Sequence, residues 1–231
     1  MAAVRRHASA LLLVLTGAAL LRVSLLSDLY LRYVKEGLRP LLIASGAVLL
    51  LLGLVSVLAG DGRRDPQHRP RSAWLLAPPA AMLLIFAPPA LGSYTVAHDG
   101  SGAIARRTHF SALPDQGTLD LTLTDFTARA AWDDSHSLAG RTVRLTGFAA
   151  PAADGTWQLS RVIVTCCAAD ARTLKVAIHG ITAPPADTWV TVTGVWRPTS
   201  GRSAPGLDAT ALTRIPQPRN PYRDTIQPVL P

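Results

Sequence analysis

Charge is scarce in this sequence. Only 16% of its 231 residues are charged, against about 25% in an average soluble domain, so the chain is too apolar for an ordinary soluble protein. Lysine occurs twice and glutamate once, whereas arginine and aspartate are common. We attribute that imbalance to a GC-rich coding bias and draw no function from it.

Recognisable catalytic motifs are also missing. The sequence contains no GxSxG turn, no P-loop, no Rossmann glycine pattern and no HExxH zinc motif. No nucleophile, base and orienting residue can be grouped into a catalytic set. We therefore predict that the protein is not an enzyme.

The positive charge that is present lies mainly in the apolar half. Residues 1–96 contain ten basic and four acidic residues, a net charge of +6, whereas residues 97–231 have thirteen and eleven, a net charge of +2. A nucleic-acid-binding protein would gather its basic residues on the polar, folded part. The distribution argues against nucleic acid as a partner and indicates charge that flanks membrane segments.

Three apolar segments predict a bundle of transmembrane helices in region 1–96, at about 8–30, 38–59 and 73–92. Residues 41–59 and 73–91 each form nineteen positions without a charge, close to the roughly 20 residues that cross a bilayer. The first segment contains Arg22 near one end, from where its side chain can reach the headgroups. A cleaved signal peptide is the alternative for this segment, but no convincing cleavage site follows it.

The flanking charges predict the orientation. Six arginines lie on one side of the predicted helices, and the other side has three nearby basic residues, joined by Arg106 and Arg107 further along. The positive-inside rule then places the N-terminus in the cytoplasm and the C-terminal domain outside the cell, in a multi-pass protein of the plasma membrane. The six are Arg5, Arg6, Arg63, Arg64, Arg69 and Arg71, and the three are Arg32, Lys35 and Arg39.

The polar half predicts a small β domain over residues 117–216, between a linker at 97–116 and a proline-rich tail at 217–231. Apolar residues alternate with polar ones in several short runs, with Leu174, Val176 and Ile178 facing inward in one of them. Residues 125–132 predict one short helix, capped by Asp125 or Thr124. Five or so bent strands with one helix are typical of an OB-like barrel, with a β-sandwich as the alternative, and make the whole chain an α+β membrane protein.

The only two cysteines, Cys166 and Cys167, are adjacent. Three interpretations stay open: small buried side chains at a strand end, a strained vicinal disulfide, or a site for zinc or another thiophilic metal ion. Consecutive strand residues point to opposite faces, so both thiols can serve one ion only if the strand ends there. Asp170 and His179 are the candidates for the remaining metal ligands.

Five strings of the sequence stand out together, namely APPALGS (87–93), VRLTGF (143–148), RVIVTCCAADA (161–171), WVTVTGVW (189–196) and PRNPYRD (218–224). With these strings the chain resembles an uncharacterised bacterial family of permease subunits of YcgQ type, which combine a DUF1980-like membrane region with an extracytoplasmic domain. The resemblance implies an accessory partner of a separate multi-spanning permease and assigns no catalytic residues. It raises the expectation of a functional role at Cys166, Cys167 and Asp170.

Together these features predict an accessory subunit of a membrane permease. Its partners are the lipid bilayer and a multi-spanning permease subunit, and its outer domain contacts a small solute or a metal ion. The alternative is a membrane-anchored, thiol-based metal or redox sensor that uses Cys166 and Cys167.

Overall fold

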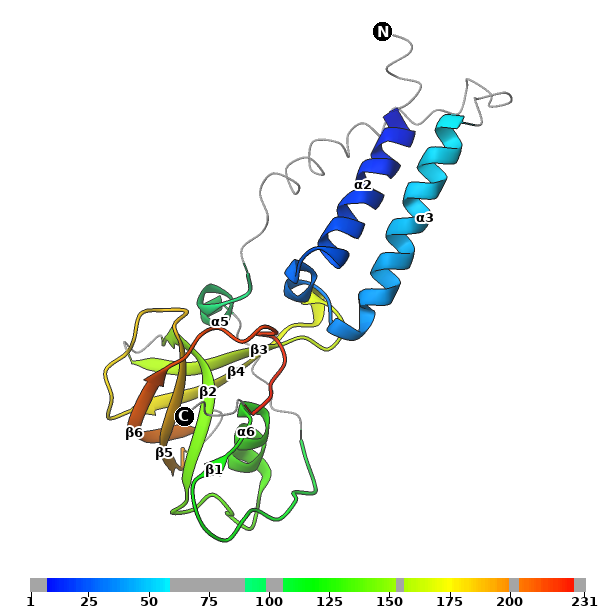
Figure 1. Cartoon of the computed structure of the whole chain (residues 1–231). Coiled ribbons are helices and arrows are strands. Elements are labelled where there is room, and N and C mark those ends of the chain that lie inside the picture. The colour runs from blue at the N-terminus through cyan, green and yellow to red at the C-terminus, as the bar shows by residue number, and fades with distance from the viewer. Residues whose placement is uncertain (1–7, 59–89, 99–105, 153–155, 200–203, 227–231) are drawn as a thin grey trace. The chain divides into compact units, whose positions relative to one another are not determined.

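The structure, a computed structural model, describes residues 8–58, 90–98, 106–152, 156–199 and 204–226. The chain divides into two units, Met1–Ala90 and Leu91–Pro231 (Figure 1). Residues 73–89 of the third predicted helix lie outside the described residues. The architecture is α+β, with helices in the first unit and a sheet with short helices in the second.

The first unit contains two apolar helices, α2 (Ala8–Leu25) and α3 (Arg39–Leu58). The stretch Glu36–Leu58 is long and apolar enough to cross a membrane, whereas Ala10–Leu25 is shorter. The first helix was predicted to reach residue 30 and instead ends at Leu25, after which Leu29–Arg32 forms a separate 3₁₀ turn. Polar Ser27 and Asp28 account for the break, because such side chains compete for backbone hydrogen bonds.

Small residues let α2 and α3 pack closely. A Cβ atom added to Gly17 would lie 2.7 Å from both the carbonyl oxygen of Gly46 and the backbone nitrogen of Leu50. At Gly53 the added atom would lie 2.6 Å from a methyl carbon of Val14. The two backbones therefore approach each other at positions that only glycine fits, as in helix pairs within lipid.

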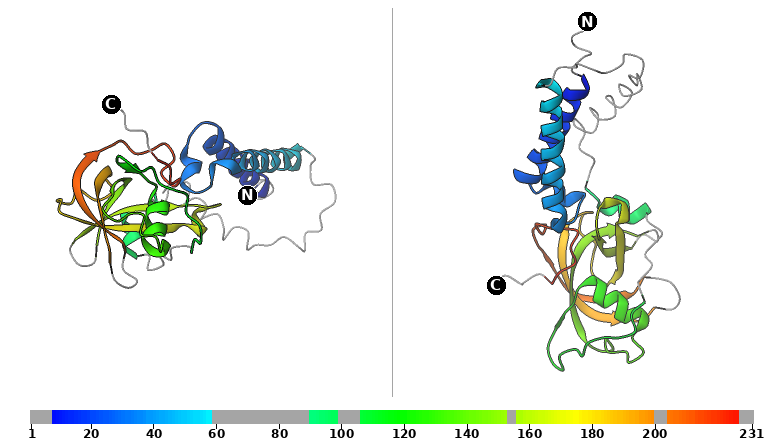
Figure 2. Two further views of the ribbon diagram at one scale, coloured as in Figure 1. Left: turned by 90° about the horizontal axis from the view of Figure 1, so that it is seen from below. Right: turned by 90° about the vertical axis from the view of Figure 1, so that its right-hand side faces the viewer.

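The second unit is built on a six-stranded mixed sheet. Its order is β1-β2-β3-β4-β6-β5, and β2 also pairs with β5. The pairs β1–β2 and β4–β6 are parallel and the others are antiparallel. The pairings of β2 to β6 therefore return to their starting strand, and the strands curl around one another (Figure 2). The bounds are Leu119–Asp120 (β1), Thr142–Pro151 (β2), Trp157–Ile163 (β3), Arg172–His179 (β4), Trp189–Arg197 (β5) and Gly206–Arg214 (β6).

Alternating side chains fill the main core of this unit. Val176 and Ile178 of β4 are buried, and Leu174 packs against the same cluster, which confirms the predicted inward face. Leu159 of β3 and Val192 of β5 are fully buried beside them. The period of two in the sequence therefore corresponds to one face that points into the core.

Helix α6 (Leu123–Trp132) covers this core with Leu123 and Phe126, both without solvent exposure. Its N-cap is Thr122, whose side-chain oxygen accepts a hydrogen bond from the backbone N–H of Asp125 at 3.0 Å. The predicted caps, Asp125 and Thr124, were wrong, because the helix starts two residues earlier than the polar run indicated.

A second apolar cluster, called here the outer cluster, joins distant parts of the unit. Its buried members are Val96, Phe148, Ala150, Val162, Trp189 and Tyr222. Val96 comes from α5 (Ser93–His98), and Tyr222 comes from the predicted tail. Helices α5 and α6 lie toward opposite ends of the unit (Figures 1 and 2). Both the segment that enters the unit and the tail are thus part of its packed structure.

Candidate functional site

The two cysteines lie in the connection between β3 and β4, at residues 164–171, called here the cysteine loop. The loop contains a short 3₁₀ turn, Ala168–Asp170. The carboxylate of Asp170 accepts a hydrogen bond from the backbone N–H of Thr165 at 2.9 Å and another from that of Cys166 at 2.8 Å. Asp170 therefore closes the loop back onto its first residues and fixes the backbone that carries the thiols.

The two sulfur atoms lie 3.7 Å apart, and both cysteines are free. Cys166 is exposed, and Cys167 is half-buried. Strand β3 ends at Ile163, so the cysteines follow the strand instead of alternating across it. The strand therefore ends before the two cysteines, which is the condition under which both thiols can serve one ion.

Asp170 also sets the charge state of the loop. The side-chain hydrogen bond to Asp170, followed by the contact with Cys167, raises the pKa of the Cys166 thiol to about 11. In turn, the hydrogen bond from Cys166 lowers the pKa of Asp170. At neutral pH the loop therefore holds a protonated thiol beside a carboxylate, and a cation that binds the Cys166 sulfur must displace its proton.

His179 does not join this group. It is the last residue of β4, whereas the cysteine loop leads into the first, and seven residue steps of strand span about 23 Å. His179 instead pairs in register with Asp208 of β6. Among the residues that the structure describes, no three histidine, cysteine, aspartate or glutamate side chains form a group that could hold a metal ion. Of the four predicted ligands, Cys166, Cys167 and Asp170 therefore share one loop, and His179 lies apart from them.

The cysteine loop is anchored to the outer cluster. Val164 and Ala171, at its two ends, pack against that cluster, and the backbone N–H of Val164 donates to the carbonyl of Tyr222 at 3.3 Å. Leu91, the first residue of the unit, packs on the same cluster. The loop, the segment that enters the unit and the tail therefore share one support.

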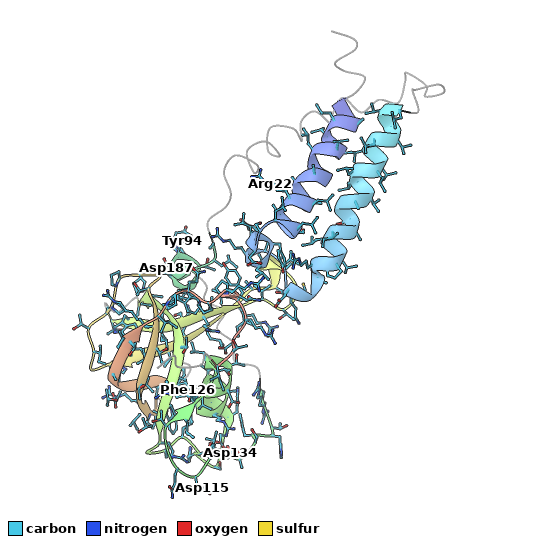
Figure 3. The ribbon with its side chains drawn as sticks, in the orientation of Figure 1. Arg22, Tyr94, Asp115, Phe126, Asp134 and Asp187 are labelled. Atoms are coloured by element: carbon cyan, nitrogen blue, oxygen red, sulfur yellow. The ribbon has the colours of Figure 1, made fainter. Side chains whose placement is uncertain are left out.

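Asp187 fixes the entering segment, a role that the sequence did not indicate. Its carboxylate accepts hydrogen bonds from the backbone N–H and the hydroxyl of Ser93, both at 2.7 Å. A Cβ atom on Gly92 would lie 2.5 Å from the same carboxylate. Figure 3 shows Asp187 beside Tyr94 of α5. The contacts with Asp187 therefore explain why glycine and serine stand at positions 92 and 93 of the APPALGS string.

Asp224 in the tail is the counter-ion of a buried arginine. The side chain of Arg161 is fully buried on β3, and one of its terminal nitrogens lies 3.3 Å from the carboxylate of Asp224. The same carboxylate accepts hydrogen bonds from the backbone N–H and hydroxyl of Thr124, at 2.7 and 2.6 Å. Burial lowers the pKa of Arg161, and Asp224 opposes that shift. The sequence singled out the PRNPYRD string, but it did not indicate which residues its aspartate contacts.

Residues 115–223 match the family described as DUF1980 C-terminal domain. The matched segment begins before β1 and ends beside Asp224, so it includes the sheet, α6 and the cysteine loop. No curated protein and no solved structure matches the chain. The sheet-containing part of this protein matches the DUF1980 C-terminal domain, and this match supports the resemblance of the chain to the DUF1980-like family.

Proposed function

We propose that the protein is a non-enzymatic accessory subunit of a membrane permease, whose DUF1980 C-terminal domain offers its cysteine loop to a thiophilic metal ion such as Zn²⁺. The observation that carries the proposal is the pair of sulfur atoms 3.7 Å apart, with Asp170 bonded across the loop. Thiolates and carboxylates are both zinc ligands. The exposure of Cys166 gives an ion access from solvent.

The ligand count assigns the other ligands to a partner. Zinc takes four ligands, and the loop supplies at most Cys166, Cys167 and Asp170. Among the described residues no three histidine, cysteine, aspartate or glutamate side chains form a group that could hold a metal ion, so the loop does not complete a site by itself. We infer that the loop holds an ion weakly when alone and more tightly when a permease adds a ligand, which suits delivery rather than storage.

An OB-like barrel is the fold we assign to the sheet. In that fold five strands close in the order 1-2-3-5-4 as a Greek-key barrel. Taking β2 to β6 as these five strands, the observed pairings follow that order, with β5 returning to β2. A β-sandwich fits less well, because it would leave two separate sheets.

Membrane insertion through three helices is the arrangement we assign to the first unit. The exposed leucines of α3, among them Leu51 and Leu58, support contact with lipid. The close glycine packing supports α2 as a second spanning helix beside α3. The proposal of a third helix depends only on the uncharged residues 73–91 and the arginines that precede them. We place the N-terminus in the cytoplasm and the domain outside, in the plasma membrane.

Metal titration of the full chain in lipid nanodiscs tests the loop. We expect Zn²⁺ to bind with release of protons, and we expect C166A/C167A to lose that binding. The matched control is D134N, which removes an acid from the same unit without touching the loop. Equal Zn²⁺ binding by wild type and C166A/C167A would falsify the metal role.

Affinity purification of the full chain from its native membrane tests the accessory role. We expect a multi-spanning protein to co-purify with wild type and with C166A/C167A, because the helices provide the main contact. A chain that purifies alone from mild detergent contradicts the accessory role, whatever the metal result.

A thiol-based redox sensor is the second candidate, favoured by the same short sulfur–sulfur distance. Oxidation would remove two electrons and two protons from the thiols and form one S–S bond, with an external disulfide as the oxidant. Mass spectrometry after treatment with oxidised glutathione distinguishes the two roles. A loss of two hydrogens at the Cys166–Cys167 peptide supports the sensor, and a stable dithiol supports the metal site.

A further inference from the structure

A pocket lies in the DUF1980 C-terminal domain, and Cys166, Cys167 and Asp170 do not line it. Its volume is about 310 Å³, at the lower end of the range for small-molecule sites. One wall is the extended segment 108–113, and the other is the end of α6 with the turn that follows it. Figure 3 labels Asp134 in that turn.

Arg129 forms the buried floor and ties the two walls together. Its side chain is 2% exposed. One terminal nitrogen donates to the carbonyl of Ser111 at 2.7 Å, and the other donates to the hydroxyl of Ser137 at 3.2 Å. Its Nε donates to Asp125 at 3.1 Å. All three guanidinium nitrogens are therefore engaged by the protein, so the pocket is preformed and its arginine is not free to hold an anion.

The remaining charge of the pocket is negative. Burial alone would raise the pKa of Asp133, but hydrogen bonds from Ser135 and Ser137 lower it to about 2, so it stays ionised. Asp134 beside it is exposed and also lines the pocket. The carboxylate of Asp133 lies 3.9 Å from Arg129, so the excess negative charge of the lining is that of Asp134. His109 is the other titratable side chain in the lining.

An aromatic face completes the pocket. Trp132, the last residue of α6, is 41% exposed. The guanidinium carbon of Arg106 lies 5.6 Å from the centre of its ring, a distance typical of a cation–π contact. The chain thus already places one of its own cations against this indole.

We propose that this pocket binds a small organic cation of the alkylguanidinium or alkylammonium class. The charged group of the ligand lies between the indole of Trp132 and the carboxylate of Asp134. The hydroxyl oxygen of Ser135 and a ring nitrogen of His109 can accept hydrogen bonds from the N–H groups of the ligand. Arg106 is the chain's own occupant of the aromatic face, and the ligand displaces it. The proposal is independent of the cysteine loop.

Isothermal titration of the full chain in nanodiscs of zwitterionic lipid tests the proposal. The probes are butylguanidine and its neutral isostere, butylurea. We expect saturable binding of butylguanidine and none of butylurea. We expect D134N and W132L each to lower the association constant about three-fold or more, in line with an exposed cation–π or ion-pair contact. The matched control D115N removes an acid that does not line the pocket and should bind as wild type does.

Arg106 gives a test with the opposite sign. R106Q removes the internal competitor, so butylguanidine should bind about two- to three-fold more tightly. R214Q removes an arginine at the end of β6 and controls for the general loss of positive charge. Equal binding of butylurea, or equal affinities of D134N and D115N, overturns the site. Unchanged or weaker binding by R106Q overturns the displacement.

Discussion

The two units place the same residue type, leucine, in opposite environments. Several leucines of α3 point outward, with Leu51 59% and Leu58 82% exposed, and α2 and α3 approach each other closely at their glycines. In the sheet Leu159 is fully buried, and the cluster around it excludes water. Apolar composition alone therefore does not distinguish a buried core from an exposed apolar surface, whereas the positions of glycine and of buried charge do.

The largest expected effect removes the buried counter-ion of the second unit. Asp224→Ala leaves Arg161 buried without its ion pair and removes the acceptor for Thr124. We expect the free energy of unfolding of this unit to fall by about 3–5 kcal/mol, as for other broken buried pairs. Denaturant unfolding followed by tryptophan fluorescence measures it.

The matched control is Asp208→Asn, which breaks the half-exposed pair with Arg197. Such a pair contributes about 0–1 kcal/mol, so the control should unfold almost as wild type does. Similar losses for both variants would mean that burial does not distinguish the two pairs.

The same leucine substitution in both units tests the comparison directly. Leu159→Ala opens a cavity in a closed core, and we expect a loss of about 2–5 kcal/mol in the unfolding of the second unit. Leu51→Ala leaves that unit unchanged and weakens membrane insertion by only about 0.5 kcal/mol. Fluorescence unfolding and a membrane-insertion assay provide the two readings. Comparable unfolding losses would contradict the outward setting of Leu51.

The glycine contacts of the first unit provide the third test. Gly17→Ala brings a Cβ atom within 2.7 Å of the α3 backbone, so the helices must move apart, at about 1–3 kcal/mol. Gly37→Ala has no neighbour within 4 Å and serves as the control. Energy transfer between probes on α2 and α3 during detergent titration measures their association. Identical curves for the two variants count against close packing.

The smallest expected effect concerns reactivity rather than stability. With the pKa of Cys166 raised to about 11, its thiolate is scarce at pH 8, and alkylation should quicken about ten-fold per pH unit until about pH 11. Asp170→Asn removes the carboxylate that favours the protonated thiol, so the pKa falls and alkylation at pH 8 quickens by roughly ten-fold or more.

Quantitative iodoacetamide labelling read by peptide mass spectrometry separates Cys166 from Cys167. Asp134→Asn leaves the loop untouched and should label as wild type does. A wild-type rate that levels off near pH 8 would show that Asp170 does not protect the thiol.

The strands and their inward faces could be predicted because the period of two reports a buried face directly, as at Val176 and Ile178. The string VTVTGV (190–195) contains a glycine inside a strand, which is typical of a bulge, and the register of β5 and β6 shifts between Thr193 and Gly194. The neighbourhood of Cys166, Cys167 and Asp170 could be predicted as well, because the three are close in sequence.

The long-range partners could not be predicted. Asp187 and Ser93 lie 94 positions apart, and Asp224 and Thr124 lie 100 apart. No local pattern pairs a particular acid with a particular helix start across such a separation. His179 failed as a partner of the cysteine loop for the converse reason: it is near in sequence, but an extended strand carries it away. The number of residues between two positions is thus a poor guide to their distance in a sheet.

The tie between Asp224 and Thr124 also has a consequence for synthesis. A ribosome that adds about 5–20 residues per second makes Thr124 roughly 5–20 seconds before Asp224, because 100 positions separate them. Arg161 is made 63 positions before Asp224, so it is present without its counter-ion for roughly 3–13 seconds of that interval. The nascent domain therefore stays incompletely folded, and accessible to chaperones or proteases, until the PRNPYRD string has been synthesised. A truncation before Asp224 would keep the domain in this incompletely folded state.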